Sequence, residues 1–266
     1  AIVSLPQTSP PSSRKRTRVC HGAMSVRESL EGVRAAVDRA AVERADRAKL
    51  PEPPPVRLVA VSKTKPVEML QEAYDVGHRH FGENYVQELV DKVPLLPGDM
   101  QWHFIGHLQG NKVATLLKGC PLMACLETID SEKLAQAVDK TWTSLYPDRK
   151  LRVMVQVNSS GEETKNGVEP SEVAALCKLI ATSMPGLELV GLMTIGAPDY
   201  SGCRTEDFEN LLRCREEAAT AIGIDVAALE LSMGMSSDFE NAILEGSTSV
   251  RVGSSIFGAR QYGKPP

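Results

Sequence analysis

Residues 58–66 read LVAVSKTKP, and this stretch decides the fold. The segment begins with four apolar or small residues, as in a strand that is buried on both faces of a parallel sheet. Pro66 suits the first turn of a following helix, where a missing backbone N–H costs nothing. Lys63 therefore lies where a buried strand ends and its loop begins. An amine that loses solvation there has a lowered pKa and can attack an aldehyde, although a solvated loop lysine fits the same pattern.

Strand-like and helix-like segments alternate about eight times after this point. Strands are expected at 57–62, 79–82, 101–106, 125–129, 151–158, 187–195, 229–232 and 250–252. Helices are expected at 67–76, 85–92, 111–118, 132–144, 171–183, 205–222 and 238–245. An amphipathic segment from residue 25 to about residue 50 precedes them. The pattern predicts an α/β fold, a single (β/α)8 TIM barrel with an extra N-terminal helix. An open doubly wound sheet is the alternative, but no G-x-G-x-x-G follows the first strand.

The composition limits the possible functions. The chain has 266 residues, of which 42% are hydrophobic, and a formal net charge of −4. Such a balance gives no basic field for nucleic acid, and no apolar run reaches membrane-spanning length. The six cysteines include no C-x-x-C pair, so neither a zinc site nor a redox motif is predicted. Scattered thiols favour a reducing compartment, and we expect a cytoplasmic protein.

Residues 1–23 differ from the rest of the chain in composition. They are rich in proline and serine, contain a basic cluster at residues 14–18, and include no acidic residue. Such a segment resembles a mitochondrial or plastid transit peptide. A disordered arm or a leader is the alternative, because Met24 directly precedes a good helix. We therefore expect a disordered extension over 1–23 and a barrel over 24–266.

The loops after the seventh and eighth predicted strands form a candidate phosphate site, since barrels often bind phosphate there. Ser237 and Glu240 have the spacing of a capping box that opens a helix, whose N-terminus would face an anion. Gly253 lets the backbone approach a ligand closely, and Ser254 and Ser255 can donate hydrogen bonds. Two ordinary caps and turns would give the same pattern.

Arg251 lies inside a predicted buried strand, where arginine needs a partner. A ligand phosphate or ring acceptor, an internal carboxylate, and an outward-facing position are competing explanations. His103 and His107 are four residues apart but lie on or just after a strand, so a helical zinc pair is not expected. No metal site is predicted.

A reactive lysine and a phosphate corner in one barrel suggest an aldehyde that carries a phosphate. Pyridoxal 5′-phosphate fits both features. A phosphosugar-binding barrel, in which Lys63 forms an imine with the substrate as in aldolases, fits the same two features.

Six segments together resemble the pyridoxal phosphate homeostasis protein family, also called proline synthase co-transcribed homologue. They are VSKTKP (61–66), FGENYVQE (81–88), WHFIGHLQGNK (102–112), LMTIGA (192–197), LSMGMSSDFENAI (231–243) and VRVGSSIFGAR (250–260). The resemblance runs from about residue 24 to residue 263. It implies a single barrel like the N-terminal domain of alanine racemase.

The resemblance also implies the site. It makes Lys63 the lysine that forms a Schiff base with pyridoxal phosphate. Six further residues carry over as cofactor contacts. The phosphate contacts are Ser236, Gly253 and Ser254, and the rest of the cofactor lining is Asn84, Met193 and Arg251. The chain departs from the family at His107, where proline or threonine is more usual, and threonine is common at the position of Ser254.

The family is taken to bind, carry and buffer pyridoxal phosphate for intracellular vitamin B6 homeostasis, without substantial catalysis. A pyridoxal phosphate-dependent racemase or decarboxylase of the same barrel is the alternative. The chain ends a few residues after the last predicted strand, so we expect no second β-rich domain and no second acid/base group opposite Lys63. Apo-enzymes that use pyridoxal phosphate are the expected partners, and the chain is expected to be a monomer or a weak dimer.

Overall fold

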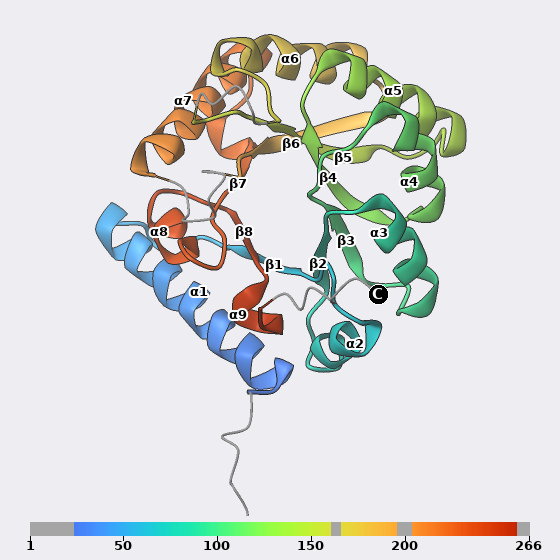
Figure 1. Cartoon of the computed structure of the whole chain (residues 1–266). Helices are drawn as coiled ribbons and strands as arrows, with labels where there is room; N and C mark the ends of the chain where they lie inside the picture. Colours follow the sequence, from blue (N-terminus) through green and yellow to red (C-terminus); the bar gives the residue numbers. More distant parts are fainter. Residues whose placement is uncertain (1–23, 161–165, 196–203, 260–266) are drawn as a thin grey trace, which may run out of the picture.

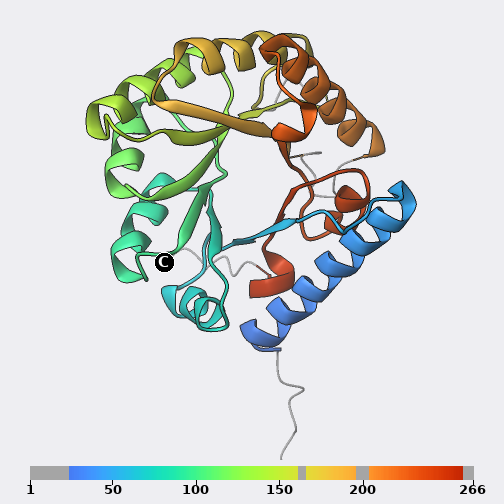
Figure 2. The same cartoon turned by 180° about the vertical axis from the view of Figure 1, so that it is seen from behind.

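The eight predicted strands form a closed parallel barrel in sequence order, with helices around it (Figure 1). This computed structural model describes residues 24–160, 166–195 and 204–259, so the predictions for 1–23 lie outside the described residues. The strands are β1 (Arg57–Val61), β2 (His80–Glu83), β3 (Gln101–Phe104), β4 (Met123–Ile129), β5 (Leu151–Gln156), β6 (Leu187–Met193), β7 (Glu230–Ser232) and β8 (Ser249–Val252). The (β/α)8 prediction is therefore confirmed, and the view from behind shows the same closed ring (Figure 2).

Helices lie on the outside of the barrel, most of them between successive strands, with one before the first strand and one after the last. They are α1 (Val26–Ala48), α2 (Val67–Asp75), α3 (Val86–Lys92), α4 (Val113–Gly119), α5 (Glu132–Leu145), α6 (Pro170–Ser183), α7 (Thr205–Ile222), α8 (Phe239–Leu244) and α9 (Ser254–Phe257). In the described part of the chain, none of these helices has the length and apolar character needed to span a membrane.

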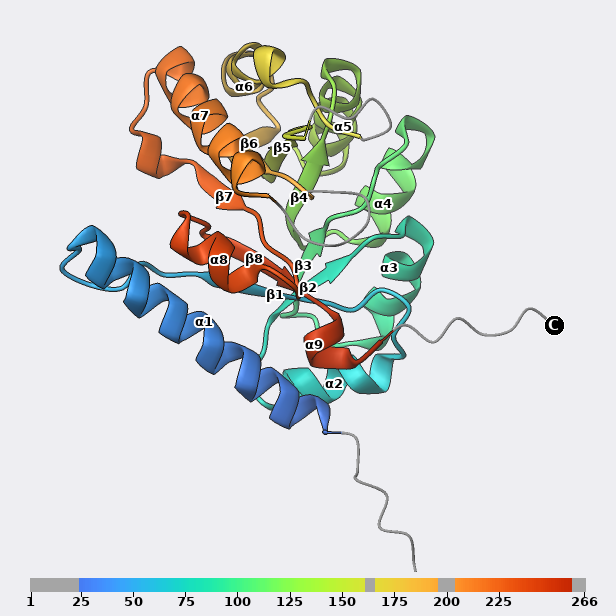
Figure 3. The same cartoon turned by 60° about the vertical axis from the view of Figure 1, so that its left-hand side comes forward.

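The extra N-terminal helix α1 begins at a capping box, in which Ser25 and Glu28 satisfy each other's backbone N–H groups. Its buried side chains form one apolar stripe, which includes Leu30, Val33 and Val37. Figure 3 shows α1 running along α8 and α9, and it packs against both helices. The helix thus covers the part of the barrel where β8 pairs with β1.

Several predicted strands extend beyond the observed ones at their C-terminal ends. Ile105 directly follows β3, Ile195 lies two residues beyond the end of β6, and both side chains line a cavity. An apolar residue at a strand end can belong to the strand itself or line a ligand pocket. The hydrophobic pattern of the sequence does not distinguish these two cases.

The predicted capping box of Ser237 and Glu240 is wrong. Helix α8 begins at Phe239, and Asp238 is its N-cap residue. The Asp238 carboxylate instead accepts a hydrogen bond from the Met235 N–H at 2.6 Å, which closes the turn between β7 and α8. Gly234 enters this turn with a φ of +96°, a conformation that favours glycine.

His78, between α2 and β2, gives the fold a predictable dependence on pH. Its side chain is buried, and burial lowers its pKa to about 4, although a bond to the His80 backbone opposes the shift. Arg34 lies 3.3 Å from Nδ1, and Nε2 lies 2.8 Å from the His80 carbonyl. This network assigns the proton to Nε2 and suits a neutral ring, because protonating Nδ1 would lose the bond from Arg34.

We expect the fold to lose stability as the pH falls through this range. The unfolded chain binds a proton at His78 near pH 6.5, whereas the folded chain binds it only near pH 4. The free energy of unfolding should therefore fall by up to about 3 kcal/mol from this group as the pH drops from 6.5 to 4. Urea titrations across this range measure the slope, which His78→Gln should flatten. An equal slope in that variant would contradict the assignment.

Candidate functional site

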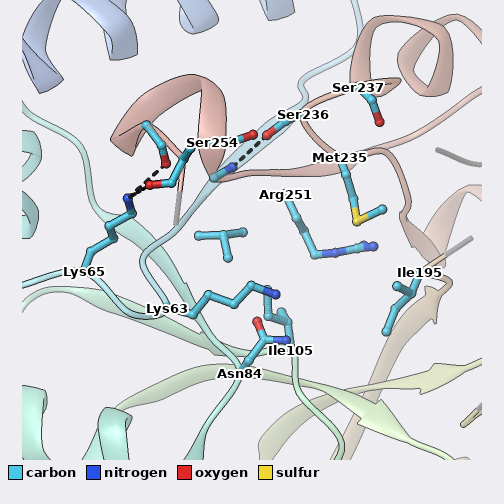
Figure 4. A pocket seen from close by; sticks show the side chains of 14 residues that line it. Lys63, Lys65, Asn84, Ile105, Ile195, Met235, Ser236, Ser237, Arg251 and Ser254 are labelled. Atoms are coloured by element: carbon cyan, nitrogen blue, oxygen red, sulfur yellow. Dashed lines mark hydrogen bonds between the residues drawn. The ribbon is translucent and has the colours of Figure 1, made fainter. Parts of the chain in front are cut away.

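A cavity of about 580 Å³ opens at the C-terminal ends of the barrel strands (Figure 4). This is the end at which barrels of this class hold their ligands. Its polar lining includes Lys63, Asn84, Ser236, Ser237, Arg251 and Ser254. Its apolar lining includes Val61, Ile105, Ile195 and Met235. A mixed wall of this kind, with a few polar groups among apolar side chains, is typical of a small-molecule site.

Lys63 occupies the place that the sequence predicts. It lies two residues beyond the end of β1, and Figure 4 shows its side chain reaching into the cavity that Asn84 and Arg251 also line. The strand carries apolar, buried residues up to this point, which brings the lysine to the mouth of the barrel.

A buried ionic network holds the backbone on both sides of Lys63. Lys92 of α3 donates to the Ser62 carbonyl at 2.9 Å and to carboxylate oxygens of Glu83 and Glu88, each at 2.7 Å. Glu88 also accepts from the Thr64 N–H at 2.6 Å. Thr64 has a φ of +63°, which a β-branched residue rarely adopts. The network therefore keeps a strained backbone in place beside Lys63.

Lys65 also lines the cavity, but its amine is held elsewhere. Its Nζ donates to the carbonyls of Phe257, Gly258 and Ala259 at 2.8, 2.9 and 2.9 Å. Partial burial lowers the pKa of Lys65, while the three carbonyls favour the ammonium form, which has three N–H donors. The side chain of Lys65 therefore binds the end of α9.

The loops after β7 and β8 meet at the predicted phosphate corner. The Ser236 hydroxyl accepts from the Gly253 N–H at 3.1 Å, so one hydrogen bond joins the two loops. A Cβ on Gly253 would lie 3.2 Å from the Val61 carbonyl oxygen, which makes this a tight position for any larger residue. Ser254 lines the cavity as the first residue of α9, where the sequence suggested a loop.

Arg251 is buried and faces inward, which excludes the outward-facing explanation. Its side chain lines the cavity and is 4% exposed. Nη1 donates to the Ser232 hydroxyl and Nη2 donates to the Thr194 carbonyl, each at 2.6 Å. The Ser232 hydroxyl in turn donates to the carboxylate of Glu127. Arg251 is thus linked through Ser232 to an internal carboxylate, as one of the competing explanations predicted, and its side chain also lines the cavity.

Asn84 follows β2 and brings an unsatisfied polar atom to the site. Its Oδ1 is buried and makes no hydrogen bond among the described residues. A buried acceptor without a partner costs free energy, so such an atom in a cavity wall fits a ligand that donates to it. A Cβ on Gly106 would lie 1.9 Å from the Asn84 carbonyl oxygen. The loop after β3 therefore packs closely against the backbone of Asn84, and only glycine fits at position 106.

Met193 does not line the cavity. It is fully buried inside the barrel in a small cluster with Cys125, Met154 and Val190, against which Ile195 packs. Sequence reasoning missed Val61, Ile105 and Ile195 as cavity residues. The feature of the sequence that could have identified these cavity residues is an apolar side chain at or just beyond the end of a strand.

Three buried side chains could in principle hold a metal ion. Donor atoms of His103, Cys125 and Glu127 lie within 4.8 Å of one another. Both Glu127 oxygens, however, already accept hydrogen bonds, from His103 and from Ser232. Burial also raises the pKa of the Cys125 thiol well above its usual value, which disfavours a thiolate ligand. His107 lies apart from this cluster and pairs with Asp130 at 3.1 Å.

Comparisons with known proteins agree on one family. A family model described as alanine racemase, N-terminal domain, matches residues 39–261. The protein of Mus musculus named pyridoxal phosphate homeostasis protein is 52% identical to this chain over 217 residues, which cover 79% of each chain. The protein of that name in Vibrio cholerae is 40% identical over 250 residues, covering 90% of this chain and 98% of its own.

Solved structures give the same picture. PipY of Synechococcus elongatus PCC7942, whose structure has PLP bound, is 31% identical with a TM-score of 0.68, covering 88% of this chain and 100% of its own. Alanine racemase from Corynebacterium glutamicum is 16% identical with a TM-score of 0.61, covering 90% of this chain and 63% of its own. The second likeness concerns the barrel fold alone.

Proposed function

Because the chain belongs to the alanine racemase N-terminal domain family and, within it, to the pyridoxal phosphate homeostasis proteins, we propose that it binds pyridoxal 5′-phosphate at the barrel mouth and buffers or carries it for vitamin B6 homeostasis. The observation that carries the proposal is the cavity itself. It combines an amine, two loops rich in hydroxyl donors, and a buried acceptor without a partner. These groups match an aldehyde, a phosphate and a donor on one ligand.

In this proposal Lys63 forms a Schiff base with the cofactor. Pyridoxal phosphate supplies a reactive aldehyde, and the amine of Lys63 is the cavity's nucleophile for it. The network around Lys92 keeps the Lys63 backbone in place. Lys65 is not proposed for this role, because three carbonyls hold its ammonium group.

The phosphate is placed between the loops after β7 and β8, with contacts from Ser236, Gly253 and Ser254. The first N–H groups of a helix have no partner within that helix, so the start of α9 adds donors beside the Ser254 hydroxyl. Asn84 and Arg251 are proposed to contact the rest of the cofactor, between the apolar side chains of the wall. Met193 would act indirectly, because the cluster that contains it supports Ile195.

The same cavity supports a carrier rather than a racemase or decarboxylase. Among its described lining residues, the titratable side chains are Lys63, Lys65 and Arg251. Racemisation needs a proton acceptor on each face of the substrate. Lys65 is engaged by α9 and an arginine stays protonated, so among these three side chains we propose Lys63 alone as a base. We propose that apo-enzymes receive the cofactor from a cytoplasmic protein that is a monomer or a weak dimer.

A phosphosugar-binding barrel of the aldolase type remains the rival with a lysine nucleophile. A visible absorbance band after mixing with pyridoxal phosphate, together with retention of the cofactor on dialysis, would favour the carrier. An aldolase-type site would instead cleave or trap a sugar phosphate.

We expect the loaded protein to release its cofactor but to turn over amino acids negligibly. The test incubates it with L-alanine in heavy water and follows α-deuteration and chirality by NMR and chiral chromatography. A parallel reaction measures activation of an apo-aminotransferase by the loaded protein, with free pyridoxal phosphate at the same concentration as the control. Rapid racemisation without activation of the aminotransferase would overturn the carrier proposal in favour of an enzyme.

A further inference from the structure

A line of hydrogen-bonded side chains crosses the barrel interior from the cavity. Arg251 of β8 donates to the Ser232 hydroxyl of β7 at 2.6 Å. Ser232 donates to one oxygen of Glu127 of β4 at 2.6 Å. The other Glu127 oxygen lies 2.6 Å from Nδ1 of His103 on β3. Only Arg251 lines the cavity, and all four side chains are buried. Barrel interiors are usually filled by branched apolar residues, so this polar line is unusual.

The charges of Glu127 and Arg251 determine which group donates and which accepts in each of these hydrogen bonds. Burial alone would raise the pKa of Glu127, but the bond and charge of His103, the charge of Arg251 and the bond from Ser232 together hold it below its usual value. Glu127 is therefore an ionised carboxylate, which only accepts hydrogen bonds. The Ser232 hydroxyl must then give its single proton to Glu127 and offer a lone pair to Arg251.

The guanidinium group of Arg251 is therefore held by hydrogen bonds from two of its nitrogens. Nη1 is held by Ser232, and Nη2 donates to the Thr194 carbonyl at 2.6 Å. Because the guanidinium group is planar, two bonds from different nitrogens define its orientation. The negative charge of Glu127 also lies on the side of Arg251 that faces the barrel interior, which stabilises a cation in a buried position.

We propose that Ser232 and Glu127 are positioning residues for the cavity, with Glu127 acting on Arg251 through the Ser232 hydroxyl. The inference rests on the proposed function, since it takes pyridoxal phosphate as the ligand that Arg251 contacts. Neither residue touches the cavity, so both act only through the placement and charge of Arg251.

Ser249 provides a matched control. It is a fully buried serine that stands opposite Ser232 in the pairing of β7 with β8. Its hydroxyl, however, makes no hydrogen bond among the described residues. Ser232→Ala and Ser249→Ala therefore remove the same group from the same depth on adjacent strands, and only the first removal affects the line to Arg251.

The experiment measures the dissociation constant of pyridoxal phosphate by equilibrium dialysis for the full chain and its variants. We expect Ser232→Ala to weaken binding about tenfold, the scale of a lost hydrogen bond to a charged group, and Ser249→Ala to change it less than about twofold. Glu127→Gln should weaken binding at least as much as Ser232→Ala, because it removes the charge as well. Thermal melting of each variant reports whether the fold is retained.

A double-mutant cycle separates positioning from a general loss of structure. In an Arg251→Gln background, Ser232→Ala should have no further effect on binding, because the residue that it positions is gone. An additive effect in that background, or an effect of Ser232→Ala no larger than that of Ser249→Ala, would overturn the inference. If the unaltered chain does not bind pyridoxal phosphate, the proposed function itself fails, which is a separate outcome.

Discussion

Replacement of Lys63 by alanine should abolish covalent retention of pyridoxal phosphate, whereas replacement of Lys65 by methionine should leave it in place. Lys63 reaches into the cavity from the end of β1 (Figure 4), and the Ser62 and Thr64 backbone on either side of it is held by a buried network. The Lys65 amine donates to three carbonyls at the end of α9, and an ammonium group in that setting has no lone pair for attack.

Borohydride reduction of the loaded protein, followed by peptide mapping, measures this prediction directly. The unaltered chain and Lys65→Met should carry a pyridoxyl adduct on Lys63, and Lys63→Ala should carry none in the cavity. Loss of the α9 contact should lower the melting temperature of Lys65→Met without moving the adduct. An adduct confined to Lys65 in the unaltered chain would refute the assignment.

The fold could be predicted from the sequence because its signal is local and repeated. Apolar runs alternate with amphipathic segments along the chain, and the eight strands close into one ring. The position of Lys63 at a strand end followed from the same pattern, since a buried run stops just before it. Errors in the strand ends arose where apolar residues such as Ile105 continue past the ladder into the cavity wall.

The partners within the site could not be predicted in the same way. Lys65 binds carbonyls about 190 residues later in the chain. The carboxylate that is linked to Arg251 lies on β4, and a serine on β7 bridges the two side chains. Closure of the barrel brings these residues together, and no spacing along the chain encodes such contacts. The capping box at Ser237 failed for a related reason, because Asp238 accepts from Met235 and starts the helix itself.

Replacement of Lys92 by methionine should strongly reduce the stability of the fold. Lys92 is almost fully buried, and its three N–H groups bind the Ser62 carbonyl and the carboxylates of Glu83 and Glu88. Glu83 is fully buried, and burial raises its pKa even though Lys92 and Ser62 oppose the shift. Lys92→Met would leave this carboxyl group without its cation, and we expect the free energy of unfolding to fall by about 3–5 kcal/mol.

Urea denaturation of Lys92→Met beside Arg47→Met tests whether burial causes this loss. Arg47 pairs with Glu43 on the exposed face of α1, so its removal should cost less than about 1 kcal/mol. Adding Glu83→Gln to Lys92→Met should recover part of the stability, because the unpaired buried acid is then replaced by a neutral group. Since the same network holds the backbone beside Lys63, Lys92→Met should also slow borohydride-trapped labelling of Lys63 at saturating pyridoxal phosphate. Equal losses of stability for Lys92→Met and Arg47→Met would show that the buried pair does not hold this strand end in place.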